Sequence, residues 1–238
     1  MNLAIVETGT TRRTAVRAAV DDSAVEVPVA RGSLGGLMYL PPNPRGAIII
    51  AHPSGIGRLS RRERFVAASL ARTGFITLLV DLLTEEEDAV REGAHTDVPL
   101  LADRLLSTAK WLGSYGASTR LPLGYLGVGT GAAAALVATA IEPRRVQAVV
   151  SRGSRPDYAG ASLLLTRVPS LFIVDGRDAC ELAANRAACG LSPYRRMEVV
   201  PSSSGTFTEG EALDRLTALS SAWFSHWLDP AFSTPDWV

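Results

Sequence analysis

Cysteine, histidine and unbalanced charge are scarce in this 238-residue sequence. Its two cysteines, Cys180 and Cys189, are expected on one helix, where nine positions at about 1.5 Å each hold them too far apart for a disulfide. We therefore expect reduced thiols. No pair among the three histidines has the spacing of metal ligands. The sequence thus predicts neither a metal site nor a cofactor.

Long runs of one charge and long apolar runs are also absent. Lysine plus arginine and aspartate plus glutamate each number 24, which argues against an extended nucleic-acid surface. No apolar segment approaches the roughly 18 residues that span a bilayer, and residues 3–6 are too short for the core of a signal peptide. We expect a cytoplasmic protein that binds a small molecule, without a nucleic-acid or membrane partner; a homodimer stays open.

Alternating strands and helices are what the sequence does contain. Strands are expected at 24–29, 34–40, 47–51, 75–81, 123–128, 146–150, 170–175 and 195–200. Helices are expected at 61–73, 98–112 and 209–228. The acidic run at 85–88 is expected to be a solvated loop. The fold class is α/β, with a mostly parallel twisted sheet, antiparallel N-terminal strands and helices on both faces.

The length indicates a single domain between two short ends. The expected arm, domain and tail are residues 1–23, 24–230 and 231–238. Ligands of such folds bind beyond the carboxyl ends of the strands. This rule gathers His52, Asp81, Gly129 and Asp175 around one cleft.

The most informative stretch is Gly127-Val128-Gly129-Thr130-Gly131, which lies between an apolar run and an alanine-rich helix. It predicts a strand, a sharp turn and a helix, as in a nucleophile elbow. Small residues are needed at Gly127 and Gly131 because the helix starts so close to the strand. The residue at the tip should be Ser, Cys or Asp, but it is Gly129.

Five segments together resemble the α/β-hydrolase superfamily, and specifically its dienelactone-hydrolase-like branch. They are residues 51–55 (AHPSG), 79–84 (LVDLLT), 127–132 (GVGTGA), 151–153 (SRG) and 175–178 (DGRD). The resemblance runs from about Val27 to Leu228. It implies an α/β-hydrolase fold, a triad of Ser or Cys, Asp and His in that chain order, and an oxyanion hole.

The resemblance also implies where each member of the triad belongs. Gly129 stands at the nucleophile position and Asp178 at the position of the acid. The histidine is expected after the last strand, where Gly205 or a neighbour stands. Because Pro53 has no N–H, the second oxyanion donor would come from Ser54 or Gly55.

We expect a non-hydrolytic enzyme, because losing both the nucleophile and the base removes acyl-enzyme chemistry. Cyclisation, elimination, isomerisation or decarboxylation of an apolar, carbonyl-bearing small molecule fits, in a setting of specialised, natural-product biosynthesis. Proton transfer is assigned to Asp178, expected near an apolar cleft, or to His52. The candidate ligand-binding residues are Ser54, Gly129, Thr130, His95, Arg152 and Cys180.

Two alternatives remain open from the sequence. The protein could be a catalytically inactive pseudoenzyme that binds a ligand or a protein partner. It could also be a hydrolase whose nucleophile has moved to Cys180 or Ser54.

Overall fold

An eight-stranded sheet forms the centre of the computed structural model, which describes residues 20–201, 207 and 210–228. The strand order is β1-β2-β4-β3-β5-β6-β7-β8. The pairings β1–β2 and β2–β4 are antiparallel, and the others are parallel. The strands are β1 (Asp21–Pro28), β2 (Ser33–Leu40), β3 (Gly46–His52), β4 (Phe75–Asp81), β5 (Leu123–Val128), β6 (Ala148–Arg152), β7 (Ser170–Val174) and β8 (Arg195–Val199).

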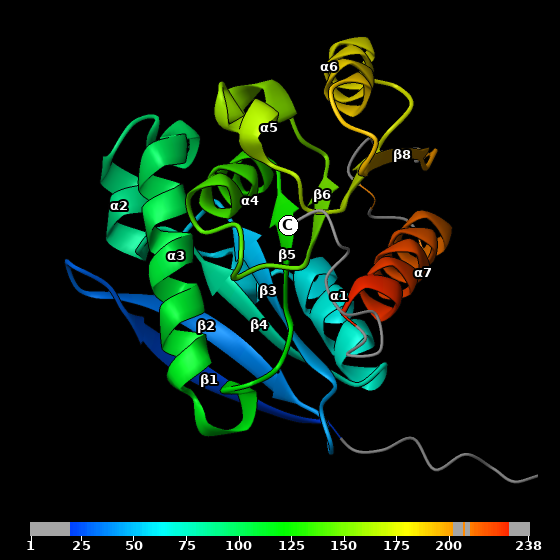
Figure 1. Cartoon of the computed structure of the whole chain (residues 1–238). Helices are drawn as coiled ribbons and strands as arrows, with labels where there is room; N and C mark the ends of the chain where they lie inside the picture. The colour runs from blue at the N-terminus through cyan, green and yellow to red at the C-terminus, as the bar shows by residue number, and fades with distance from the viewer. Residues whose placement is uncertain (1–19, 202–206, 208–209, 229–238) are drawn as a thin grey trace, which may run out of the picture.

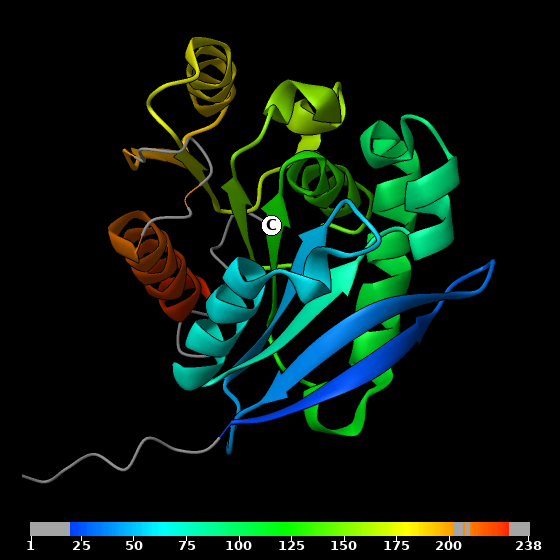
Figure 2. The ribbon, with the colours of Figure 1, turned by 180° about the vertical axis from the view of Figure 1, so that it is seen from behind.

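Helices cover both faces of the sheet (Figures 1 and 2). One face packs against α1 and α7, and the other against α3 and α4, with α5 and α6 beside them. The helices are α1 (Arg61–Arg72), α2 (Glu85–Val90), α3 (Val98–Ser114), α4 (Thr130–Ile141), α5 (Ser162–Leu165), α6 (Ala179–Gly190) and α7 (Gly210–Trp227). The predicted α/β class, with its antiparallel N-terminal strands, is confirmed.

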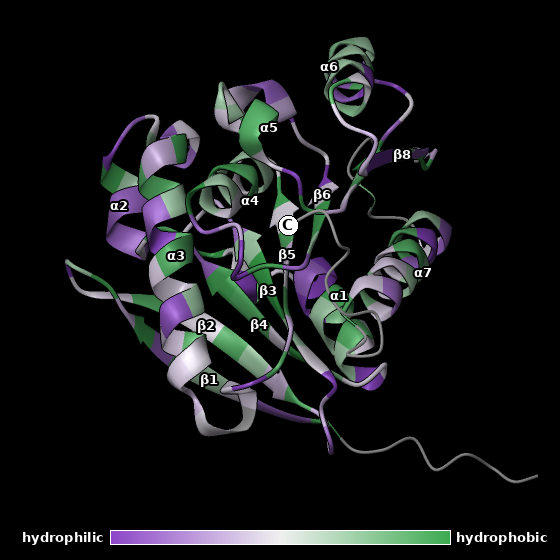
Figure 3. Ribbon diagram, viewed as in Figure 1, coloured by the Kyte–Doolittle hydropathy of each residue, from purple (hydrophilic) through white to green (hydrophobic). Residues whose placement is uncertain are grey.

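The central strands are apolar because both of their faces are buried. In β3, Ile48 and Ile50 pack on the side of α1 and α7, whereas Ile49 packs on the opposite side, and all three are fully buried. Each such side chain stabilises the fold by about 1.5 to 3 kcal/mol. The edge strand β8 is hydrophilic instead (Figure 3), which disfavours pairing with another chain.

Three expected elements need correction. The acidic run at 85–88 is not a loop: it begins α2, where Thr84 and Glu87 form a capping box. The first strand begins at Asp21, so it takes in the last three residues of the predicted arm. The strand expected at 146–150 is β6, two residues further on. Most of the arm and the whole tail lie outside the described residues.

None of the helices in the described ranges is long and apolar enough to cross a membrane. Cys180 and Cys189 both lie on α6, as expected, and both are free thiols.

Candidate functional site

A sharp turn joins β5 to α4, and its tip is Gly129. This residue has φ 54° and ψ −126°, a conformation that side chains rarely adopt. A Cβ atom on Gly127 would lie 2.2 Å from Ala132 Cα, and one on Gly131 would lie 2.4 Å from Ala51 O. A Cβ atom on Gly129 would meet nothing within 4 Å. The turn therefore requires its small flanking residues and leaves open space at its tip.

Thr130 begins α4 next to this open tip. As the first residue of the helix, it has a backbone N–H that no carbonyl of the same helix can accept. Its hydroxyl donates to the backbone carbonyl of His95. His95 is exposed, and the turn binds its backbone carbonyl, not its imidazole.

His52, at the end of β3, contacts a serine two residues later. Ser54 Oγ lies 2.9 Å from His52 Nδ1, and the Ser54 N–H donates to the same nitrogen at 3.3 Å. Nδ1 is therefore the unprotonated nitrogen of the ring. Burial lowers the pKa of His52, although nearby Glu63 opposes this shift. The imidazole is thus neutral at pH 7 and able to accept a proton.

The loop that follows His52 is held by hydrogen bonds from several elements. The Gly55 N–H donates to Asp88 Oδ2 of α2 at 3.1 Å. Arg58 binds Asp81 through its backbone N–H at 2.9 Å and through Nη1 at 2.6 Å. A Cβ atom on Gly57 would lie 2.2 Å from the His52 ring, so only glycine allows this packing. The loop and the imidazole are fixed together.

These bonds correct the expectation about the oxyanion hole. The Gly55 N–H is used by Asp88, and the Ser54 N–H is directed at His52 Nδ1. Neither of the two expected donors is free. Of the predicted oxyanion donors, the backbone N–H of Thr130 is the one that has no hydrogen-bond partner among the described residues.

A buried ion pair lies near His52. Glu63 Oε1 accepts from Arg152 Nη2 at 2.6 Å and from Arg62 Nε at 2.8 Å. Burial disfavours the charge of Glu63, but Arg152 and Arg62 outweigh it, and the pKa of Glu63 is lowered. Glu63 is fully buried and Arg152 nearly so. The Arg152 guanidinium therefore serves this ion pair, which the sequence did not indicate.

A second polar group lies at the carboxyl ends of β6 and β7. We call Asp175, Asp178, Glu181 and Asn185 the acidic cluster. Asn185 Nδ2 donates to the carbonyls of Ser154 and Glu181, both at 2.8 Å. Burial raises the pKa of Glu181 to about 7, and the charges of Asp178 and Asp175 add to the shift. Sequence reasoning placed Asp175 at the cleft and assigned proton transfer to Asp178. It missed Glu181 and Asn185, although the spacing of three between the acids was a readable signal for Glu181.

A hollow of about 590 Å³ lies elsewhere, between α1 and α7. Its wall includes Phe65, Ser69, Thr73, Asp214 and Thr217. None of the predicted site residues lines it. The hollow is therefore separate from the polar residues at the carboxyl ends of the strands.

Known proteins place this architecture in a family. No protein-family model matches the sequence. The crystal structure of a dienelactone hydrolase from Anabaena variabilis is 40% identical, with a TM-score of 0.83, and the match covers 88% of this chain and 99% of that one. The chain belongs to the dienelactone-hydrolase-like family. A dienelactone hydrolase-like promiscuous phosphotriesterase from metagenomic libraries has the same fold at 15% identity, with a TM-score of 0.72 over 88% of this chain and 99% of that one.

Two Mycobacterium tuberculosis proteins, from strains H37Rv and CDC 1551, are 42% identical over 215 residues. Both bear the name "Putative phosphoribosyl transferase". The match covers 88% of this chain but 48% of theirs, so the chain spans about half the length of these relatives.

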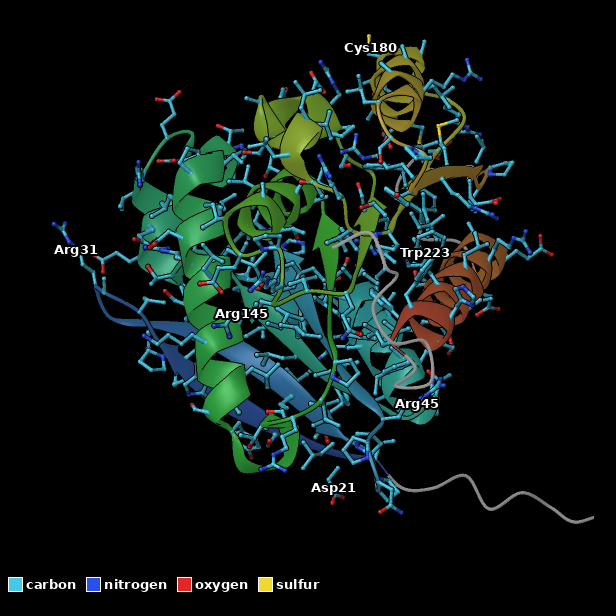
Figure 4. All side chains as sticks on the ribbon, in the orientation of Figure 1. Asp21, Arg31, Arg45, Arg145, Cys180 and Trp223 are labelled. Carbon is cyan, nitrogen blue, oxygen red and sulfur yellow. The ribbon has the colours of Figure 1, made fainter. Side chains whose placement is uncertain are left out.

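Two predicted site residues of this dienelactone-hydrolase-like chain lie on the surface. Asp178 is exposed, not set in an apolar cleft, and its Oδ1 caps α6 by accepting from the N–H groups of Cys180 and Glu181 at 2.8 and 2.9 Å. Cys180 is exposed and points outward from the start of α6 (Figure 4). Gly205 lies outside the described residues. In the described part of the chain, no group of three His, Cys, Asp or Glu side chains is arranged to hold a metal ion.

Proposed function

We propose that this chain is a non-hydrolytic enzyme on an α/β-hydrolase fold. The observation that carries the proposal is the open tip at Gly129, set in the conformation of a nucleophile elbow but without a side chain. In this proposal Gly129 replaces the nucleophile, and Gly205 or a neighbour replaces the histidine. An acyl-enzyme at the elbow then has neither of its reacting groups.

His52 would supply the chemistry as a proton carrier. Its neutral Nδ1 can take the proton of the Ser54 hydroxyl while the Ser54 oxygen takes a proton from the carbon beside a substrate carbonyl. The Thr130 N–H would stabilise the negative oxygen of the resulting enolate. Return of the proton to another carbon gives isomerisation, and departure of a leaving group gives elimination. An apolar, carbonyl-bearing substrate, as in natural-product biosynthesis, suits this chemistry; cyclisation and decarboxylation could use the same site.

The name of the Mycobacterium tuberculosis relatives suggests phosphoribosyl transfer. The chain matches only 48% of their length and has a hydrolase fold. We infer that the transferase part of those relatives lies in their unmatched half.

A second candidate function has one observation in its favour. The 2.9 Å contact between Ser54 Oγ and His52 Nδ1 has the geometry of a nucleophile and its base. Ser54 could then attack an ester carbonyl while His52 takes the hydroxyl proton, and water would later release the acyl group. Cys180 lacks such support because it points outward and no contact between it and a histidine is found among the described residues.

Proton exchange in D₂O tests the leading proposal without knowledge of the natural substrate. The probes are a set of enones and β-keto esters, and NMR follows the loss of their α-protons. We expect exchange by the wild type, at least a tenfold loss in His52→Ala, and a rate that rises with pH through a pKa below the usual 6.5 of histidine and then stays level. Equal rates for wild type and His52→Ala would instead support a pseudoenzyme.

Acylation separates the two catalytic candidates. The protein is incubated with 4-nitrophenyl acetate and its intact mass is measured. The non-hydrolytic proposal predicts no stoichiometric adduct, whereas an adduct that disappears in Ser54→Ala and persists in Cys180→Ser would establish the second candidate.

Restoring the missing groups tests the assignment of the elbow. Gly129→Ser has space for its side chain, at a backbone cost of about 1 to 3 kcal/mol. We expect Gly129→Ser combined with Gly205→His to gain esterase activity over either single variant. No gain in a folded double variant counts against these two positions as the lost triad members.

A further inference from the structure

The acidic cluster contains three oxygen atoms that accept no hydrogen bond. They are Asp175 Oδ2, Glu181 Oε1 and Asn185 Oδ1, and all three atoms are buried. Asp175 is 2% exposed and Asn185 is fully buried. A buried acceptor without a donor costs about 1 to 3 kcal/mol, and more if it is charged, so native proteins rarely leave three of them together.

Hydrogen bonds fix which end of the Asn185 side-chain amide is the oxygen. Both N–H groups of its amide are used, because Nδ2 donates to the carbonyls of Ser154 and Glu181. Exchange of the amide oxygen and nitrogen would break both bonds, so Oδ1 stays an acceptor. Glu181 lies one turn earlier on the same face of α6. The Asn185 amide therefore bonds both to the Ser154 backbone and to the turn of α6 that carries Glu181.

No ion pair between described side chains balances the negative charge of the cluster. None of the salt bridges between described side chains includes Asp175, Asp178 or Glu181. The raised pKa of Glu181 reflects burial first, and then repulsion by Asp178 and Asp175. A cation with hydrogen-bond donors would relieve the unmatched acceptors and the repulsion at once.

We propose that the acidic cluster binds the primary ammonium group of a ligand. An ammonium group has three N–H donors and no acceptor, which matches three unpartnered oxygens, two of them from carboxylates. A metal ion fits less well, because the acid side chains of the described chain are not arranged to hold one. A guanidinium group would spread five donors over a plane, whereas the three donors of an ammonium group match the three free oxygens one to one.

Residues 152–154 connect the cluster to the proposed reaction site. The Gly129 N–H donates to the Arg152 carbonyl at 3.1 Å, and Ser154 follows Arg152 by two residues. A ligand with its ammonium group in the cluster can therefore extend its remaining atoms toward the elbow. That the ligand is also the substrate, an amine-bearing carbonyl compound, rests on the proposed function; the ammonium site itself does not.

Binding of a simple amine tests the site. The probe is ethylammonium chloride, followed by ¹H–¹⁵N NMR at the Asn185 side-chain amide and the Ser154 backbone amide. We expect saturable shifts of these signals. Tetramethylammonium chloride has the same charge but no N–H donor, and we expect no saturable shift with it.

Substitutions locate the site. We expect Asp175→Asn to weaken ethylammonium binding at least about tenfold and Glu181→Gln to weaken it by a smaller factor. Asp157→Asn is the matched control, because Asp157 is exposed and paired with Arg155 on the neighbouring segment, and we expect no change. The dispersed amide spectrum of each variant reports that it is folded.

Three results would overturn the proposal. One is the absence of saturable shifts at accessible ethylammonium concentrations, which would mean that a proton shared by Glu181 satisfies the cluster. Another is equal binding by wild type and Asp175→Asn. The third is binding of Mg²⁺ at the same residues with displacement of ethylammonium, which would make this a metal site. Since none of these readouts uses catalysis, the proton-exchange experiment on His52 stands or fails separately.

Discussion

Two groups of acidic residues lie near the carboxyl ends of the strands, and their negative charges are balanced differently. Near the end of β3, Glu63 in the first turn of α1 binds Arg152 and Arg62, and Asp81 at the end of β4 binds Arg58. At the ends of β6 and β7, the acidic cluster forms no ion pair with a described side chain and leaves three buried acceptors free, whereas the first group leaves one, Glu63 Oε2. Each group contains a fully or nearly fully buried acid, Glu63 and Asp81 in the first and Asp175 in the second, but ion pairs between described side chains occur only in the first.

The difference appears in the proton affinity of two glutamates. Burial disfavours ionisation of both, yet Arg152 and Arg62 bring the pKa of Glu63 below its usual value, while Asp178 and Asp175 help raise the pKa of Glu181 to about 7. The charges near β3 hold a loop and an imidazole in place. The acidic cluster has the opposite character: it is a site whose donors are missing from the described chain.

The largest expected effect comes from removing Glu63, the acid of the buried ion pair. Glu63→Ala leaves the Arg152 guanidinium buried without its counter-charge, which costs about 3 to 5 kcal/mol of unfolding free energy. Urea denaturation measures this loss. Glu142→Ala is the control, because it breaks the exposed pair with Arg145 and should cost at most about 1 kcal/mol. Equal losses in the two variants would contradict a stabilising role for the buried pair.

In the acidic cluster, removal of a negative charge should raise the unfolding free energy instead of lowering it. Asp175→Asn keeps the oxygen that accepts from the Arg177 N–H and replaces the unpartnered Oδ2 by an N–H donor. We expect the unfolding free energy to rise by about 1 to 2 kcal/mol, again measured in urea. A loss of stability as large as that of Glu63→Ala would show that the acidic cluster is a structural element, not a site left open for a ligand.

The strands could be predicted because apolar runs report burial directly, and β4 has the predicted bounds. The helix α2 was missed because a run of acids was interpreted by its charge alone. Thr84 followed three residues later by Glu87 is the signature of a capping box, and acids in a first turn are favoured by the helix dipole. Local signals in the sequence were thus sufficient for α2 but were given too little weight.

The site was predictable only where its contacts are local. His52 and Ser54 are two residues apart, and both were candidates. Glu63 and Arg152 are 89 positions apart, and their pairing depends on how α1 packs over the sheet, which no local pattern specifies. The same holds for Asn185, whose buried amide depends on the carbonyl of Ser154, 31 positions away. Long-range polar contacts therefore account for most of what the sequence did not show.

The smallest expected effect is a pH dependence that separates Glu181 from ordinary surface acids. Its pKa is about 7 in the fold and 4.5 in an unperturbed side chain, so between these values the folded state holds more protons than the unfolded state. Stability due to this group therefore falls as pH rises from about 4.5 to 7. Glu181→Gln removes the ionisation, so its melting temperature should match the wild type at low pH and exceed it above pH 7. Because Glu181 is only half-buried, we discount the gain to about 1 kcal/mol, a few degrees. The exposed Glu86→Gln should follow the wild-type curve throughout; a parallel curve for Glu181→Gln would mean that its carboxylate is not strained by its neighbours.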